Sequence, residues 1–374
     1  MHGGMLRAAR VVGCGVVALF MVAYGSGTAS AVSHGSKAAT LKVGLLLDGA
    51  ANDGSWNQAA VQGMQSAEAE FGSKIQVTIE QSVPFSSTAT EVVNELVSKG
   101  YSLFFADTSG WETYLAPVAK AHPNVLIEEA DSAVRSGNFR GYYSAYADTE
   151  YLAGMMAEGA ATNHRVGIIA GFPFPGYFNE INGVALGAQA VYAKAVSQVI
   201  YVSSFYDPAK EAQAAKALVA AGATAIVGMN NDPASCEAVA SQHIPCLGSD
   251  IINGASNEPG TYLGSFMNYT GWAFVEVISD LLRGTEPPML LFGYYSNGSG
   301  AIAYVGPAYN KLVSAHDRAL VAQKTALLKA GKFFVFSGPL REQNGDLVLK
   351  AGSHLTPEQI ITQDYLVQGV VGKT

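Results

Sequence analysis

The sequence has little charge and few side chains that bind metals. Only 14% of its 374 residues are Asp, Glu, Lys or Arg, whereas 49% are hydrophobic. It contains no cluster of Lys and Arg that would neutralise a nucleic-acid backbone, which argues against a nucleic-acid partner. Its three Cys and seven His show no spacing typical of a metal site. We therefore expect large hydrophobic cores, no metal and no cofactor.

Familiar catalytic motifs are also missing. The stretch Gly248-Ser249-Asp250 lacks the frame of a G-x-S-x-G nucleophile elbow. No Gly-rich stretch ends in the Gly-Lys-Ser/Thr of a phosphate-binding loop, and residues 293–300 do not have the spacing of a dinucleotide fingerprint. Asp and Glu are common enough that a catalytic pair stays open as an alternative. The sequence favours a binding protein over an enzyme.

Residues 1–31 have the pattern of a secretory signal peptide. Arg7 and Arg10 form a short basic region, residues 11–24 are an apolar run, and Ala29-Ser30-Ala31 fits a cleavage site with small residues at both ends. Cleavage after Ala31 removes two basic residues and no acid, so the net charge changes from −8 to −10. We expect an exported, periplasmic product.

Residues 32–40 are expected to form a flexible leader. Two alternatives to a free exported protein remain open. The apolar run is short for a membrane span but can act as an uncleaved anchor. Cys14 follows Val-Val-Gly, as in a lipoprotein signal, although it lies ahead of most of the apolar run.

Cys236 and Cys246 remain after cleavage of the signal peptide. An exported protein meets oxidising conditions, and an even number of Cys favours a disulfide between them. The alternative is two buried free thiols, one on a helix and one on a strand.

From residue 41 onward, apolar runs typical of strands alternate with helical patterns, which predicts doubly wound parallel sheets. The series restarts near residue 148, which indicates two similar lobes, and no low-complexity linker separates them. In the first series, strands are expected at 43–47, 75–80, 102–106, 125–129 and 141–145, with helices at 57–71, 88–99 and 112–121. In the second series, helices are expected at 148–161, 177–193, 208–221 and 234–242, with strands at 165–171, 198–203, 225–228 and 244–248. Beyond it, strands are expected at 262–267 and 347–350, and helices at 272–282, 312–330 and from 356.

The loop at residues 48–58 follows the first apolar strand and precedes a helix. Ligands of open α/β sheets bind at the carboxyl ends of the strands, so this loop is a candidate for ligand contact. Trp56 offers a flat ring for stacking, and Asn57 offers an amide for hydrogen bonds. The alternative is that Trp56 belongs to the core and Asn57 only caps the helix.

Other aromatic residues also follow predicted strands, and rings that face a cleft suit a planar, neutral ligand. The alternative is that some of them pack against the bases of the loops. The rings in question are Trp56, Trp111, Phe172, Phe174, Phe205 and Tyr206.

Several short motifs occur in an order and spacing that together resemble a known family. They are Asp53-Gly-Ser-Trp-Asn-Gln58, Ser109-Gly-Trp111, Tyr151-Leu-Ala-Gly154, Gly171-Phe-Pro-Phe-Pro175 with Ile181-Asn182, Ser204-Phe-Tyr-Asp-Pro208 with Lys210-Glu211, Gly248-Ser-Asp250, and Ser337-Gly-Pro339 with Gly345 and Gly369-Val370. Over about residues 41–370 the chain resembles the basic membrane protein (BMP) family of ABC-transporter solute-binding proteins, which includes purine-nucleoside-binding lipoproteins.

The resemblance implies a type I periplasmic binding fold, in which two Rossmann-like lobes are joined by three crossovers and hold the ligand in the cleft. It places residues 41–145 and 265–330 in lobe 1, and residues 146–264 with 331–374 in lobe 2 and its C-terminal crossover. A hinge would close the lobes on the ligand.

The resemblance also implies roles for single residues. Trp56 and Asn57 would contact a purine base, Phe205 would supply a second ring, and Asp250 an acid. The predicted ligand-binding residues are Asp48, Trp56, Asn57, Gly110, Trp111, Phe172, Phe205, Tyr206, Asn231, Asp250 and Asn268.

Some positions depart from the pattern of nucleoside binders. Many of those proteins have Phe where Trp56 stands, and Trp56 together with Phe-Pro-Phe-Pro is closer to a branch thought to bind free purine bases. That branch often has Trp at the position of Phe205 and Asp at that of Asn231. The choice between base and nucleoside therefore stays open.

The sequence thus predicts a monomeric binding protein that captures a purine base or nucleoside for an ABC permease in the membrane. Three alternatives remain: a binder of sugars or other polar solutes, an exported nucleoside hydrolase, and the ligand-sensing domain of a signalling partner. Sugar binders of this fold usually clamp hydroxyl groups with several Arg and Asp, and Arg is scarce here.

Overall fold

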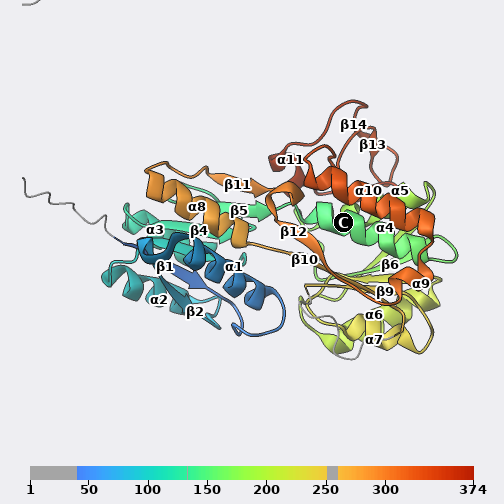
Figure 1. The fold of residues 1–374 in the computed structure, drawn as a ribbon, viewed down its shortest axis with the longest axis horizontal. Coiled ribbons are helices and arrows are strands. Elements are labelled where there is room, and N and C mark those ends of the chain that lie inside the picture. Colours follow the sequence, from blue (N-terminus) through green and yellow to red (C-terminus); the bar gives the residue numbers. More distant parts are fainter. Residues whose placement is uncertain (1–39, 133, 251–259) are drawn as a thin grey trace, which may run out of the picture. The chain divides into compact units, whose positions relative to one another are not determined.

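The computed structural model describes residues 40–132, 134–250 and 260–374. The predicted signal peptide, Cys14 and residues 32–39 of the leader lie outside these ranges. The described chain contains two large parallel sheets, each with helices on both faces (Figure 1). In the described residues no helix is both long and apolar enough to cross a membrane.

The first sheet has six parallel strands in the order β11-β5-β4-β3-β1-β2. Their bounds are β1 Leu41–Leu46, β2 Ile75–Glu80, β3 Leu103–Ala106, β4 Leu126–Ala130, β5 Phe139–Ser144 and β11 Leu290–Gly293. The helices beside them are α1 Trp56–Phe71, α2 Ser87–Ser98, α3 Glu112–Ala121 and α8 Gly271–Arg283, with a 3-10 turn η1 at Gly72–Lys74.

Successive side chains of the first sheet point to opposite faces, and each face packs on its own helices. Val43 and Leu45 join the hydrophobic cluster that contains residues of α1 and α8, whereas Leu46 joins the cluster with α2 and α3. In the same way, Phe105 belongs to the cluster with α1 and α8, and Phe104 belongs to the cluster with α2 and α3. Burial on both faces explains why β3 and residues 43–46 of β1 are continuous apolar runs in the sequence.

The second sheet has seven strands in the order β12-β10-β9-β8-β6-β7-β15, all parallel to their neighbours except β12, which is antiparallel to β10. Their bounds are β6 Arg165–Ala170, β7 Val196–Tyr201, β8 Ala225–Gly228, β9 Cys246–Ser249, β10 Tyr262–Asn268, β12 Gly300–Val305 and β15 Val370–Val371. A separate antiparallel pair consists of β13 Leu340–Arg341 and β14 Leu347–Leu349.

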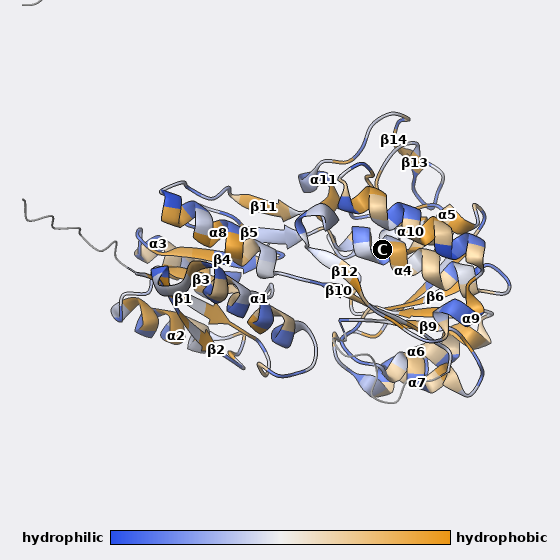
Figure 2. Ribbon diagram, in the orientation of Figure 1, coloured by the Kyte–Doolittle hydropathy of each residue, from blue (hydrophilic) through white to orange (hydrophobic). Residues whose placement is uncertain are grey.

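Helices also cover both faces of the second sheet, and their buried hydrophobic residues pack against it. Figure 2 shows that strands of this sheet, such as β6 and β9, are mainly hydrophobic. One face carries α6 Pro208–Ala220 and α7 Ala234–Ala240. The other carries α4 Tyr146–Ala160, α5 Phe178–Val191, α9 Tyr309–Leu312 and α10 Ala315–Lys329. The remaining elements are η2 Tyr295–Asn297 and α11 Pro357–Ile361.

Helices α4 and α5 approach each other closely because glycine occupies their contact. A Cβ at Gly154 of α4 would collide with the backbone of Val184, and a Cβ at Gly187 of α5 would collide with the backbone of Tyr151. Residues with larger side chains would force the helices apart.

The chain passes between the two sheets three times, after β5, after β10 and after β11. The three passing segments are hydrogen bonded to one another. The Ala145 N–H donates to the Gly293 carbonyl at 2.7 Å, the Tyr269 N–H donates to the Ser299 carbonyl at 2.9 Å, and the Ser144 hydroxyl donates to the Tyr269 carbonyl at 3.1 Å.

Two details differ from the sequence-based assignment. The segment 265–330, expected with the first lobe, divides between the sheets: α8 and β11 pack with the first, whereas β12 pairs with β10 in the second and α10 packs on α4. The expected helix 312–330 is interrupted, because Ser314 is extended and its hydroxyl caps α10 by accepting the N–H of Asp317 at 3.1 Å.

Candidate functional site

A cavity of about 540 Å³ lies where loops from the carboxyl ends of both sheets meet. This is the edge of a parallel sheet where ligands bind. Its lining comes from the loops after β1, β3, β4, β6, β7, β8 and β9, from the strands β5, β9 and β10, and from the helices α1, α4, α5 and α11. Of the predicted ligand-binding residues, the cavity is lined by Asp48, Trp56, Asn57, Phe205, Tyr206, Asn231, Asp250 and Asn268.

The loop after β1 is fixed by Asp53, whose carboxylate accepts the backbone N–H groups of Ser55, Asn57 and Gln58 at 2.8, 3.2 and 3.0 Å. Asp53 also accepts the side-chain amide of Asn57 at 2.9 Å. The Asn57 side-chain oxygen is buried and has no partner among the described residues. Asn57 therefore presents chiefly an acceptor to a ligand.

The Trp56 ring is half-buried on the cavity wall. Its indole N–H donates to the carbonyl of Asp107 at 2.6 Å, so its hydrogen-bonding atom is already used. The ring centre lies 6.3 Å from that of Tyr146 with a tilt of 36°. The hydrogen bond to Asp107 thus fixes the orientation of the Trp56 ring, which offers its aromatic surface to a ligand.

Phe205 lines the cavity with 45% of its surface exposed. Its ring is supported by edge contacts with Phe172 and Tyr177, with ring centres 5.0 and 5.8 Å away. Gly171 allows this packing, because a Cβ there would meet the Phe205 ring at 2.8 Å. The uncovered part of Phe205 is available to a flat ligand.

Gly110, Trp111 and Phe172 do not reach the cavity wall. Trp111 is fully buried between α2 and α3, and its indole N–H donates to the carbonyl of Pro84 at 3.2 Å. Gly110 has a positive φ of 119° and lies against the ring of Phe85. Phe172 instead supports Phe205. From the loop after β3, Thr108 and Ser109 line the cavity.

Asp250 is buried at the end of β9, and its carboxylate accepts the Ser249 hydroxyl at 2.8 Å and the Asn268 N–H at 3.1 Å. Burial raises the pKa of Asp250 to about 6. The Asn268 side chain donates to Glu150 at 3.0 Å, which leaves its own oxygen without a partner among the described residues. This corner of the cavity presents acceptors.

Further acids lie on the opposite part of the lining. Burial raises the pKa of Asp131 to about 7, and the Tyr146 hydroxyl donates to Asp131 at 2.7 Å. The pKa of Glu180 is raised by burial and by nearby carboxylates. The pKa of Asp48 is raised chiefly by desolvation, which a hydrogen bond from Asn57 partly offsets.

One residue with a fixed positive charge, Arg135, lines the cavity within the described part of the chain. Its guanidinium donates to both carboxylate oxygens of Glu358 on α11 at 3.0 and 2.9 Å, and to the carbonyl of Ser132 at 3.0 Å. The carboxyl groups therefore outnumber the cations, and the cavity suits neutral ligands with N–H or hydroxyl donors better than phosphates.

Several lining residues were missed by the sequence reasoning. Tyr143 and Tyr146 flank the end of β5, and Ile361 and Thr362 come from α11 near the end of the chain. For Tyr143 a signal existed, since it belongs to the predicted strand 141–145, close to the carboxyl end of β5. The described residues contain no group of three or more His, Cys, Asp or Glu arranged to hold a metal ion.

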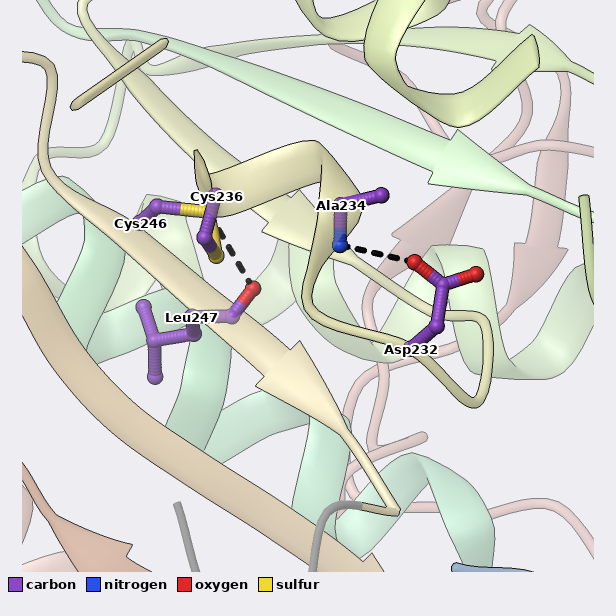
Figure 3. The surroundings of a disulfide bond; sticks show 5 residues. All are labelled: Asp232, Ala234, Cys236, Cys246 and Leu247. Carbon is purple, nitrogen blue, oxygen red and sulfur yellow. Dashed lines mark hydrogen bonds between the residues drawn. A yellow bond between two sulfur atoms is a disulfide. The ribbon is translucent and has the colours of Figure 1, made fainter. Parts of the chain in front are cut away.

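Cys236 on α7 and Cys246 on β9 form a disulfide, with their Cα atoms 5.3 Å apart (Figure 3). The bond lies behind the cavity, and it joins the helix that follows the Asn231 loop to the strand that ends next to Asp250.

Several known proteins are similar to this chain in sequence. The purine-binding protein of Brucella abortus is 27% identical over 335 residues, which cover 89% of this chain and 93% of that protein. The nucleoside-binding protein BmpA of Lactococcus lactis is 29% identical over 222 residues, or 57% of this chain and 62% of that protein. A putative glucose-binding protein of Haloferax volcanii is 27% identical over 183 residues, or 49% and 46%.

The fold has solved counterparts. An ABC transporter solute-binding protein of Conexibacter woesei superposes with a TM-score of 0.63 at 20% identity, covering 79% of this chain and 98% of that one. The predicted type I periplasmic binding fold is confirmed. The family profile described as ABC transporter substrate-binding protein, PnrA-like, matches residues 40–286. This chain therefore belongs to the family of PnrA-like substrate-binding proteins of ABC transporters.

Proposed function

We propose that the protein captures a purine base or nucleoside in the cavity and delivers it to an ABC permease. The observation that carries this proposal is that Trp56 and Phe205, from loops of different sheets, line one cavity with aromatic surface left uncovered. Flat heteroaromatic rings bind such surfaces by stacking, which contributes about 1–3 kcal/mol per base. The purine-binding relative from Brucella supports the same ligand class.

The polar lining fits the edge of a purine. Asn57 and Asn268 each present an amide oxygen without a partner among the described residues, and Asp250 presents a carboxylate. Purine N–H groups and ribose hydroxyls are donors that would satisfy them. A volume of about 540 Å³ is in the range of small-molecule sites and holds either a base or a nucleoside.

Ligand capture would involve closure of two lobes about the three hydrogen-bonded passing segments. In this proposal one lobe contains the first sheet, which includes β11, together with α8. The other lobe contains the second sheet together with α10 and α11. The closed, ligand-bound protein would act as a monomer outside the cytoplasmic membrane and dock on the permease. Since binding proteins release their ligand unchanged, incubation with purine nucleosides should release no free base.

A sugar is the second candidate, because the glucose-binding relative matches about half of this chain and carboxylates also bind hydroxyl groups. A thermal-shift panel of adenine, guanine, adenosine, guanosine, ribose and glucose separates the two. A ligand at a hundred times its Kd stabilises the protein by about 2.7 kcal/mol. We expect a rise in Tm with purines alone. A rise with a sugar and none with any purine would overturn the proposal.

A further inference from the structure

Two loops of the cavity wall are hydrogen bonded to each other. They are residues 203–207 after β7, which include Phe205, and residues 229–234 after β8, which include Asn231. The Asn231 N–H approaches the Phe205 carbonyl at 3.4 Å, and the Asn230 side chain donates to the first loop at 3.2 Å. The position of the Phe205 ring thus depends on this junction.

Two buried carboxyl groups lie beneath the junction. Glu211 on α6 is 0% exposed, and Asp232, just before α7, is 4% exposed. Glu211 Oε1 accepts the N–H of Asp207 at 3.2 Å, and Asp232 Oδ1 accepts the N–H of Ala234 at 2.7 Å (Figure 3). Each side chain therefore uses one oxygen to hold one of the two loops.

The second oxygens of the two side chains, Glu211 Oε2 and Asp232 Oδ2, are buried, and the Glu211 carboxyl contacts both the Asp232 carboxyl and the side-chain amide of Asn230. Two ionised carboxylates at contact repel each other, so a stable pair needs a shared proton. Burial raises the pKa of Glu211 to about 8, and the contact with Asp232 adds to the rise. Glu211 is therefore the acid that keeps its proton at neutral pH.

The other titratable groups nearby do not neutralise the charge of this carboxyl pair in place of the shared proton. The remaining titratable groups on α6 and on the elements packed against it are Asp207, Lys210, Lys216, Glu237, Arg165 and Tyr201. Asp207 is paired with Lys210 at 3.0 Å, and Lys216, Glu237 and Arg165 are exposed. Tyr201 stays neutral, since burial raises its pKa to about 12.

We propose that Glu211 is a positioning residue for ligand binding: as a neutral acid it donates its hydroxyl to Asp232 and so holds the Phe205 loop against the Asn231 loop. This inference rests on the proposed function, because both loops matter only if the cavity holds the ligand. When Glu211 ionises, two buried negative charges repel and the loops separate. Ligand affinity therefore falls as the pH rises through the pKa of Glu211.

The test is calorimetric titration of the tightest purine ligand at pH 6.5 to 9.5 with the wild type, Glu211→Gln and Glu211→Ala. Gln keeps both the acceptor for Asp207 and a donor for Asp232 but does not titrate. We expect Glu211→Gln to bind as the wild type at pH 7, and Glu211→Ala to bind about tenfold more weakly. Above pH 8 the wild type should weaken relative to Glu211→Gln, and this ratio cancels the titration of the ligand itself.

The matched control is Glu237→Gln, an exposed Glu on α7, which should follow the wild type at every pH. A constant ratio between the wild type and Glu211→Gln from pH 6.5 to 9.5, or a Glu211→Gln variant as weak as Glu211→Ala at pH 7, would overturn the inference alone. If the wild type binds no purine at all, both the proposed function and this inference, which depends on it, are refuted.

A readout without ligand is the carbon-13 NMR carboxyl signal that the Glu211→Gln substitution removes. Its midpoint is expected near pH 8. A midpoint below pH 6 would show that Glu211 is ionised at neutral pH and would refute the shared proton.

Discussion

Replacing Phe205 by Ala removes an aromatic ring from the cavity wall. The ring is 45% exposed, and the rings of Phe172 and Tyr177 support it along its edges. A stacked purine would cover the exposed part. Loss of one stacking ring costs about 1–3 kcal/mol, which corresponds to a Kd weakened about 5- to 150-fold. Because much of the ring is outside the core, the Tm should change little.

The chain offers a matched control in Phe85. This residue is 48% exposed, packs on the ring of Trp111 with centres 5.0 Å apart, and does not line the cavity. Isothermal titration of a purine into Phe205→Ala and Phe85→Ala should show weakened binding in the first variant and wild-type binding in the second. Equal affinities in all three proteins, or equal losses in both variants, would refute the assignment of Phe205 to the site.

Three further predictions concern stability. Burial raises the pKa of Asp131 to about 7 and the pKa of Asp250 to about 6. Between about pH 4, where unfolded Asp titrates, and about pH 7, the native state therefore binds more protons than the unfolded state. The free energy of unfolding should fall as the pH rises through this window. Urea titrations at pH 4.5, 6 and 8 check this, and Asp131→Asn should reduce the slope; a stability that increases across the window would contradict it. Replacing Cys236 and Cys246 by Ser opens a loop with a sequence separation of 10 and should cost about 2–3 kcal/mol by the chain-entropy relation, which urea unfolding of oxidised wild type and variant measures. Asp53→Ala removes the acceptor of three backbone N–H groups at the start of α1 and should lower the free energy of unfolding by about 1–2 kcal/mol, and Asp53→Asn should lower it less. An Asp53→Ala variant as stable as the wild type would show that these hydrogen bonds do not stabilise the loop.

The fold was largely predictable because most strands are buried on both faces. Continuous apolar runs such as residues 43–47 mark those strands, and glycines mark the ends of several helices. The place of the loop after β1 on the cavity wall was predictable for the same reason, since the loop follows the first strand and Trp56 and Asn57 stand at its end, where α1 begins. Asp250, which lies at the end of β9, was named from the family resemblance and not from the strand pattern.

The side-chain directions within loops were not predictable from sequence. Trp111 and Phe205 both follow strands, yet Trp111 turns into the core between α2 and α3, whereas Phe205 stays in the cavity. Arg135 lines the cavity but was not among the predicted ligand-binding residues. Its position depends on Glu358, which lies 223 residues further along the chain, and no local pattern reports a contact of that range.

A crystal structure of the protein with its tightest purine ligand is the most direct test of the central claim. The account predicts a purine ring in contact with the rings of Trp56 and Phe205, with its polar edge at Asn57 and Asp250. A purine bound outside this cavity, or one inside it that touches neither ring, would contradict the account.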